Sequence, residues 1–190
     1  TQDGQILLPT YYGDPPEMDP SGSYLFKSED AGRTWRFENR IAFDNEKRDV
    51  SYVEPALALT PGGKLLAFHR TFKLADRLVT CRSNDYGSSW SEPKVWDQIK
   101  GHPHHPLMLK DGRIFLSYGY RHKPYGIRAR LIDCEKECEA GNELVIRDDG
   151  PCGDLGYPWA CELPNGRVLV VYYFCDQMGL RHIAASLIEL

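Results

Sequence analysis

Two eight-residue stretches decide the fold of this chain: Ser28-Glu29-Asp30-Ala31-Gly32-Arg33-Thr34-Trp35 and Ser83-Asn84-Asp85-Tyr86-Gly87-Ser88-Ser89-Trp90. Both read Ser-x-Asp-x-Gly-x-(Ser/Thr)-Trp, and their tryptophans are 55 residues apart. The Asp carboxylate can accept N–H bonds from the residues that follow it, and the Gly can take a positive φ, so each stretch predicts a tight hairpin. A Trp at its end can bury a large apolar area between neighbouring strands. We therefore expect Trp35 and Trp90 to be buried in equivalent places.

A second repeat runs in step with the first. Four turns carry a glycine and lead into runs of β-branched, aliphatic or aromatic residues; these glycines are Gly4, Gly63, Gly112 and Gly166, separated by 59, 49 and 54 residues. Three of the turns are Asp-Gly or Asn-Gly, a strong signal for a β-hairpin. No stretch shows a sustained helical period with caps. A period near fifty in an all-β chain predicts a propeller or a repeat array, which we place in a single domain over residues 1–190.

Composition excludes several classes of protein. With 23 basic against 27 acidic residues and a net charge of −4, the chain has no electrostatic basis for binding nucleic acid or an anionic membrane. Its longest apolar run, 168–174, is too short to span a bilayer. The 17 glycines and 13 prolines are dispersed, which excludes a disordered tract. The first residues form neither a signal peptide nor a transit sequence, and they indicate a chain that begins partway through a larger domain.

The six cysteines do not fix a compartment. No Cys-x-x-Cys occurs, so neither a zinc ribbon nor a thioredoxin-like redox pair is supported. Cys134 and Cys138 lie four apart in a charged segment; they could form a local disulfide, although two unrelated thiols are the favoured interpretation.

The Ser-x-Asp-x-Gly-x-(Ser/Thr)-Trp pattern is the Asp-box of the BNR repeat, and the chain resembles the sialidase (neuraminidase) superfamily. Segments that carry the resemblance further are 54–57 leading to 68–71, 118–121, and 154–158. The resemblance implies a six-bladed β-propeller, of which this chain would supply about four blades. It also implies that the first arginine and the acid/base aspartate of the family lie before the segment matching residue 1. A chain with open propeller edges would need further blades or self-association to cover them. By resemblance the protein would be secreted or periplasmic.

The same resemblance implies roles for four residues. Tyr157 would be the nucleophile, Glu54 the base that takes its phenolic proton, and Arg70 and Arg121 the clamp for a substrate carboxylate, with no cofactor. A neutral phenol suits attack near a carboxylate, and its usual pKa of about 10 explains why a base must lie beside it. Guanidinium suits carboxylate because it presents a planar, always-charged fork. We expect these side chains to converge, with Glu54 and Tyr157 within about 2.6–3.2 Å.

Arg128 competes with Arg121 for the role of substrate arginine. It lies on an alternating stretch with Arg130 and could simply cover the blade, whereas Arg121 follows a strand end and suits the mouth of a channel better. The loop 101–106 carries three histidines, which could line a sugar pocket, act as acid or base, bind a metal or form a surface turn. We expect His102 to line the pocket and expect no metal site.

Two functions from different classes follow. The first is an exo-acting glycoside hydrolase whose substrate is an acidic sugar such as sialic acid, or a glycosidase of other specificity that uses His102 or His105. The second is a carbohydrate-binding or vestigial propeller without catalysis, because propellers host many activities. Either function makes a glycan or a small acidic sugar the partner.

Overall fold

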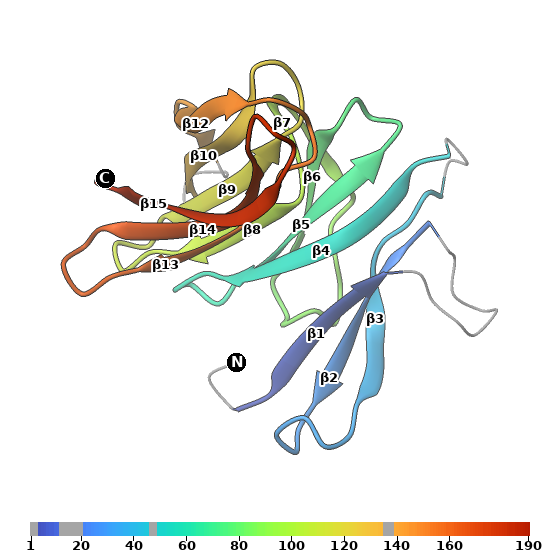
Figure 1. Ribbon diagram of the computed structural model, residues 1–190. Helices are drawn as coiled ribbons and strands as arrows, with labels where there is room; N and C mark the ends of the chain where they lie inside the picture. The colour runs from blue at the N-terminus through green and yellow to red at the C-terminus, as the bar shows by residue number, and fades with distance from the viewer. Residues whose placement is uncertain (1–3, 12–20, 46–48, 135–138) are drawn as a thin grey trace. The chain divides into compact units, whose positions relative to one another are not determined.

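The chain is built from β-strands in four antiparallel sheets, shown in Figure 1, a computed structural model that describes residues 4–11, 21–45, 49–134 and 139–190. These residues contain no helix, so nothing in the described ranges could cross a membrane as a helix. The all-β prediction is therefore confirmed. The chain forms two compact units, Thr1–Ile99 and Lys100–Leu190, each with two sheets.

The first unit holds a three-stranded and a four-stranded sheet. Their strands, in spatial order, are β1 (Ile6–Tyr11), β2 (Ser23–Ser28) and β3 (Arg36–Ala42), then β4 (Ser51–Leu59), β5 (Leu65–Phe72), β6 (Arg77–Ser83) and β7 (Lys94–Lys100). β1 lies beside β4, and the core between the sheets includes Leu25 of β2, Tyr52 of β4 and Val79 of β6. The inner strands β2, β5 and β6 are buried over most of their length.

Both Asp-boxes form the predicted hairpins. The first joins β2 to β3, where Asp30 accepts bonds from the Thr34 N–H at 2.8 Å and the Thr34 hydroxyl at 2.6 Å. The second joins β6 to β7, where Asp85 accepts the same pair of bonds from Ser89 at 2.8 and 2.5 Å. Because these hydroxyls and N–H groups stabilise the carboxylate, the pKa values of Asp30 and Asp85 fall to about 2.

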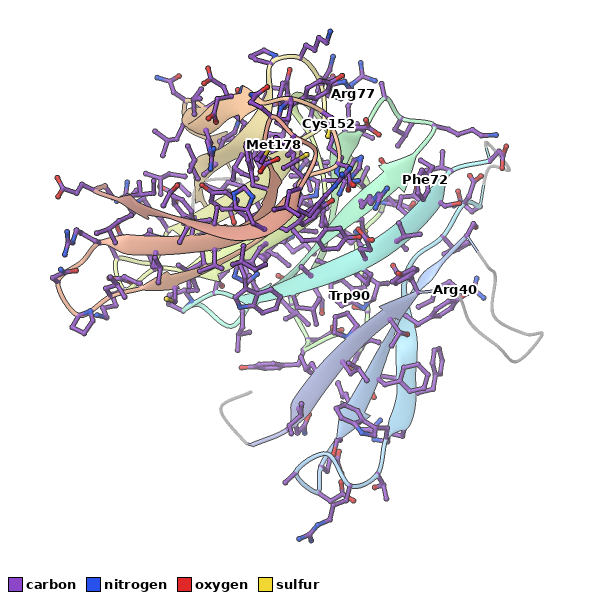
Figure 2. The ribbon with its side chains drawn as sticks, viewed as in Figure 1. Arg40, Phe72, Arg77, Trp90, Cys152 and Met178 are labelled. Atoms are coloured by element: carbon purple, nitrogen blue, oxygen red, sulfur yellow. The ribbon has the colours of Figure 1, made fainter. Side chains whose placement is uncertain are left out.

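The two Asp-box tryptophans differ in burial. Trp90, labelled in Figure 2, is half-buried and packs against the core of the first unit. Trp35 is 40% exposed, and its indole N–H donates back to Gly32 O within its own turn. The expectation of two buried tryptophans was therefore wrong for Trp35. The second turn packs against Leu25 of the neighbouring sheet, whereas the nearest non-local atom to the first turn's glycine belongs to Ile6 at the edge of its own sheet.

The second unit holds a five-stranded and a three-stranded sheet. Their strands are β8 (His104–Met108), β9 (Ile114–Tyr120), β10 (Tyr125–Asp133), β11 (Glu139–Ala140) and β12 (Leu144–Gly150), then β13 (Gly156–Glu162), β14 (Val168–Cys175) and β15 (Arg181–Ile188). β8, β9 and β10 pair in sequence, and both β11 and β12 pair with β10; β13 packs beside β8 and β9. The core joins Phe115 and Ile127 of one sheet to Val170 and Phe174 of the other.

The third sheet departs from the Asp-box pattern, as the loss of Gly and Trp near 132–139 predicts. Its outer edge is divided between β11 and β12, and the register of β12 against β10 shifts twice. Residues 135–138, which include Cys138, lie outside the described residues, while Cys134 is buried.

Candidate functional site

Glu54 and Tyr157 occupy the same kind of place in two different sheets. Each lies in the first strand of its sheet, directly before a proline and inside a shift of strand register. Each also has a φ of 47°, in the left-handed region that non-glycine residues rarely adopt. A bulge of this kind re-aims a side chain away from the regular pleat. Strained residues cluster at functional sites, which makes both positions candidates for chemistry.

In the first unit, Glu54 is paired with Arg70. The Arg70 Nη1 lies 3.2 Å from both carboxylate oxygens of Glu54, and both side chains are largely buried. The ring of Phe72, labelled in Figure 2, covers the guanidinium, with its centroid 4.9 Å from Arg70 Cζ. The guanidinium of Arg70 is therefore held by the ring of Phe72 and by the carboxylate of Glu54.

In the second unit, Tyr157 lies beside Arg121. Tyr157 is 49% exposed, and its ring centroid lies 5.8 Å from Arg121 Cζ. The backbone is tight at this point: a Cβ on Gly119 would lie 2.8 Å from His102 O and 3.0 Å from Gly156 Cα. Glycine at 119 therefore allows β9 to approach the start of β13. This approach brings Arg121, the residue directly after β9, to the phenol.

Two further residues of this site, Tyr173 and Asp154, were not predicted from the sequence. Tyr173 on β14 accepts a bond from the Arg121 Nη2, and Asp154 in turn accepts one from Tyr173. The run 168–174 is apolar or aromatic throughout, so the sequence does not distinguish Tyr173 from Tyr172 and Phe174, which lie on the opposite, buried face of β14. No pattern in the sequence pointed to Asp154 as its acceptor.

Arg128 lies in a different setting from Arg121. It is 3% exposed on β10, where its Nη1 donates to Arg147 O and its Nη2 donates to Pro124 O. The Tyr120 ring packs against its guanidinium at 4.8 Å. Because its donors are used inside the sheet, we leave Arg128 out of the proposed site.

The histidine loop does not present three open imidazoles. His102 and His104 are buried, and the His102 N–H donates to Gly119 O where the loop enters β8. His105 stacks on Trp159 with ring centroids 4.2 Å apart and an interplanar angle of 28°. Burial lowers the pKa of His105, partly offset by its contact with Ala160 O, so the imidazole is neutral at physiological pH. That His102 contacts a ligand stays a prediction.

Comparison with known proteins assigns the family. A family model for the BNR repeat-like domain matches residues 1–170. The chain belongs to this family. No curated protein matches it. A crystal structure of a protein of unknown function from Dyadobacter fermentans is 41% identical with a TM-score of 0.90, covering 100% of this chain and 51% of that one. The chain therefore spans about half the length of that protein.

Other structures similar to this BNR chain share its fold at low identity. The K499G mutant of NanB sialidase from Streptococcus pneumoniae is 18% identical with a TM-score of 0.69, covering 97% of this chain and 29% of that one. The α-L-arabinanase of Penicillium chrysogenum, solved with arabinobiose, is 18% identical with a TM-score of 0.67, covering 97% and 58%. These likenesses, with the four antiparallel sheets, confirm a sialidase-like BNR fold.

The geometry thus joins the predicted residues in two pairs. Glu54 meets Arg70 within the first unit, and Arg121 meets Tyr157 within the second. Each pair combines a guanidinium with a group that can take part in acid–base or nucleophilic chemistry. The distance expected between Glu54 and Tyr157 stays a prediction.

Proposed function

We propose that this chain is part of a glycoside hydrolase whose substrate is a sugar that carries a carboxylate. The observation that carries the proposal is the exposed phenol of Tyr157, held at a bulge beside the guanidinium of Arg121. A guanidinium beside the phenol can bind the carboxylate of the substrate. The fold is that of sialidases and other glycosidases, which supports the assignment by analogy.

Each of the four residues has one task in the proposed reaction. The Tyr157 oxygen attacks the anomeric carbon and forms a glycosyl–enzyme bond, while the phenolic proton passes to the Glu54 carboxylate. Arg70 orients that carboxylate, as their ion pair suggests. Arg121 binds the substrate carboxylate. The leaving sugar departs with the glycosidic oxygen and takes a proton from solvent. Water then attacks the anomeric carbon and gives it a hydroxyl group while the glycosyl–tyrosine bond breaks. The Tyr157 oxygen regains the proton held by Glu54, and the second proton of the water passes to solvent.

The test removes one oxygen from the nucleophile. Tyr157→Phe should lower kcat on 4-methylumbelliferyl α-N-acetylneuraminide by at least about 10³-fold, because it deletes the attacking atom. Tyr86→Phe is the matched control, since Tyr86 is also a partly exposed tyrosine, 36% exposed, with a positive φ of 55°. It should keep wild-type rates. Comparable kcat in wild type and Tyr157→Phe would remove Tyr157 from the mechanism.

A second candidate is carbohydrate binding without hydrolysis, and Trp159 favours it. Trp159 is 71% exposed, two residues along β13 from Tyr157, and one indole face is backed by His105. An exposed aromatic ring held in place by a stack can pack against the apolar face of a sugar ring. Calorimetric binding of 3′-sialyllactose that is weakened by Trp159→Ala, with no turnover in wild type, would select this function.

Pairing of this chain with further blades or with a second copy stays a prediction, as does secretion. Size-exclusion chromatography with light scattering would test self-association directly.

A further inference from the structure

The guanidinium of Arg121 is held on two of its three nitrogens. Its Nε–H donates to Leu155 O at 3.0 Å, and its Nη2 donates to the Tyr173 hydroxyl at 3.0 Å. Among the residues that the structure describes, Nη1 makes no hydrogen bond. The guanidinium is therefore held along one edge, and the N–H groups of Nη1 and the second N–H of Nη2 are left to donate to a carboxylate.

The direction of the Tyr173 hydrogen bonds is determined by Asp154. The Tyr173 hydroxyl donates to Asp154 Oδ1 at 2.8 Å, so its oxygen is left to accept from Arg121. Asp154 Oδ2 is held by Arg181, at 2.9 Å from Nε and 2.7 Å from Nη2. An unbroken chain of hydrogen bonds therefore runs from Arg181 through Asp154 and Tyr173 to Arg121.

Tyr173 is a neutral phenol in this chain. Burial, followed by the bond to Asp154, raises the pKa of Tyr173 to about 12. The bonds from Tyr173 and Arg181 lower the pKa of Asp154. Both groups therefore keep their protonation state across the physiological range. The ring of Tyr173 also lies 6.1 Å from that of Tyr157, which places the hydroxyl network beside the proposed nucleophile.

We propose that Tyr173, oriented by Asp154, is a positioning residue that aims Arg121 at the carboxylate of the substrate. This inference rests on the proposed function, since it assigns the support for one arm of the same site. Without the Tyr173 hydroxyl, Arg121 keeps only its bond to Leu155 O and can rotate about that bond. A carboxylate would then meet a guanidinium that has to be ordered on binding.

The neighbouring tyrosine supplies a matched control. Tyr172 lies on the opposite face of β14, is 2% exposed, and its hydroxyl shares a 2.7 Å hydrogen bond with Ser186. Tyr172→Phe therefore removes one partly buried hydrogen bond from the same strand and leaves the contacts of Arg121 in place. Tyr173→Phe removes the hydroxyl that holds Arg121.

The kinetic test compares these two variants on 4-methylumbelliferyl α-N-acetylneuraminide. Tyr173→Phe should raise KM about tenfold and leave kcat within about twofold, because a carboxylate contact is made in both the ground state and the transition state. Tyr172→Phe should leave KM unchanged. Asp154→Asn, which keeps an oxygen acceptor for Tyr173, should raise KM less than Asp154→Ala. An active wild type whose KM is unchanged in Tyr173→Phe overturns the inference.

A second measurement does not depend on activity. The Nε–H of Arg121 should give a resolved, slowly exchanging NMR signal in the wild type and in Tyr172→Phe. Tyr173→Phe should broaden that signal or speed its exchange. If the wild type turns over no acidic glycoside, the proposed function fails; equal Arg121 signals in wild type and Tyr173→Phe would by themselves overturn the positioning role.

Discussion

At the scale of single residues, the environment of a side chain determines its chemistry more than its residue type does. His69 and His105 both lie on strands. His105 stacks on Trp159, whereas His69 is fully buried in the first unit. The Nε2 of His69 lies 2.8 Å from Ser23 Oγ, and its ring is edge-on to Tyr52. Desolvation lowers the pKa of His69 to about 4. His69 is therefore a neutral structural residue that could be mistaken, in sequence, for a catalytic one.

This pKa gives the first unit a defined acid sensitivity. In the unfolded chain His69 titrates near 6.5, so the unfolded state binds more protons than the folded state between about pH 6.5 and 4. The contribution of neutral His69 to the free energy of unfolding is therefore fully present above pH 6.5. It is lost as the pH falls toward 4, and the loss is roughly 3 kcal/mol at most. Chemical denaturation at pH 7.5 and 4.5 measures the loss. His69→Gln should reduce it, whereas His182→Gln, at an exposed position, should not. Equal pH dependence in wild type and His69→Gln would contradict this origin.

At the scale of elements, the two Asp-boxes are the same turn in two packing environments. Gly32 and Gly87 have φ values of 86° and 92°. A Cβ on Gly87 would overlap Leu25 Cδ2 of the neighbouring sheet, whereas a Cβ on Gly32 would meet nothing closer than the Trp35 ring at 3.7 Å. Comparing substitutions at Gly32 and Gly87 therefore distinguishes the effect of the left-handed backbone from the effect of packing against the neighbouring sheet.

Gly87→Ala should consequently destabilise the protein more than Gly32→Ala. Both pay the cost of a left-handed alanine, about 1–2 kcal/mol, and Gly87→Ala adds an overpacking term of about 1–3 kcal/mol. Urea unfolding of the two variants gives the difference. If Gly87→Ala and Gly32→Ala lose the same free energy of unfolding, Leu25 can move to make room for the added methyl group, and packing between the sheets does not require glycine at 87.

The same elements show which features of the fold could be predicted from the sequence. The Asp-boxes and Gly turns predicted the strands, the hairpins and the period, because these depend on local backbone chemistry. The exposure of Trp35 could not be predicted, because burial depends on which sheet lies against a turn. The bulges at Glu54 and Tyr157 were equally hidden, since a proline after a polar residue does not reveal a positive φ. Tyr173 was missed because its run, 168–174, looks like a buried strand throughout.

At the scale of the whole molecule, fold and function have separate support. The BNR fold follows from the family match and the four sheets, while the proposed hydrolysis would depend on a few side chains in each unit. Two of those side chains, Glu54 and Tyr157, lie at equivalent structural positions: each is in the first strand of its sheet, at a bulge, and directly before a proline. Because Glu54 and Tyr157 occupy equivalent positions in repeated sheets, we expect them to act in the same reaction step. Kinetic measurements can test this without knowing the distance between the two side chains.

The test is a double-mutant cycle on kcat. Glu54→Gln alone should lower kcat by about 10²–10⁴-fold, as expected for loss of a general base. If Glu54 takes the proton of Tyr157, Glu54→Gln combined with Tyr157→Phe should be no slower than Tyr157→Phe alone, because a phenyl ring has no proton to give. Glu162→Gln is the control carboxylate: Glu162 lies at the end of β13, where its side chain accepts the Lys110 N–H. That variant should leave kcat near wild type. If the two substitutions lower kcat multiplicatively in the double variant, Glu54 and Tyr157 act in separate steps. The role of Glu54 would then be to hold Arg70 in place, and Glu54 would not be the base.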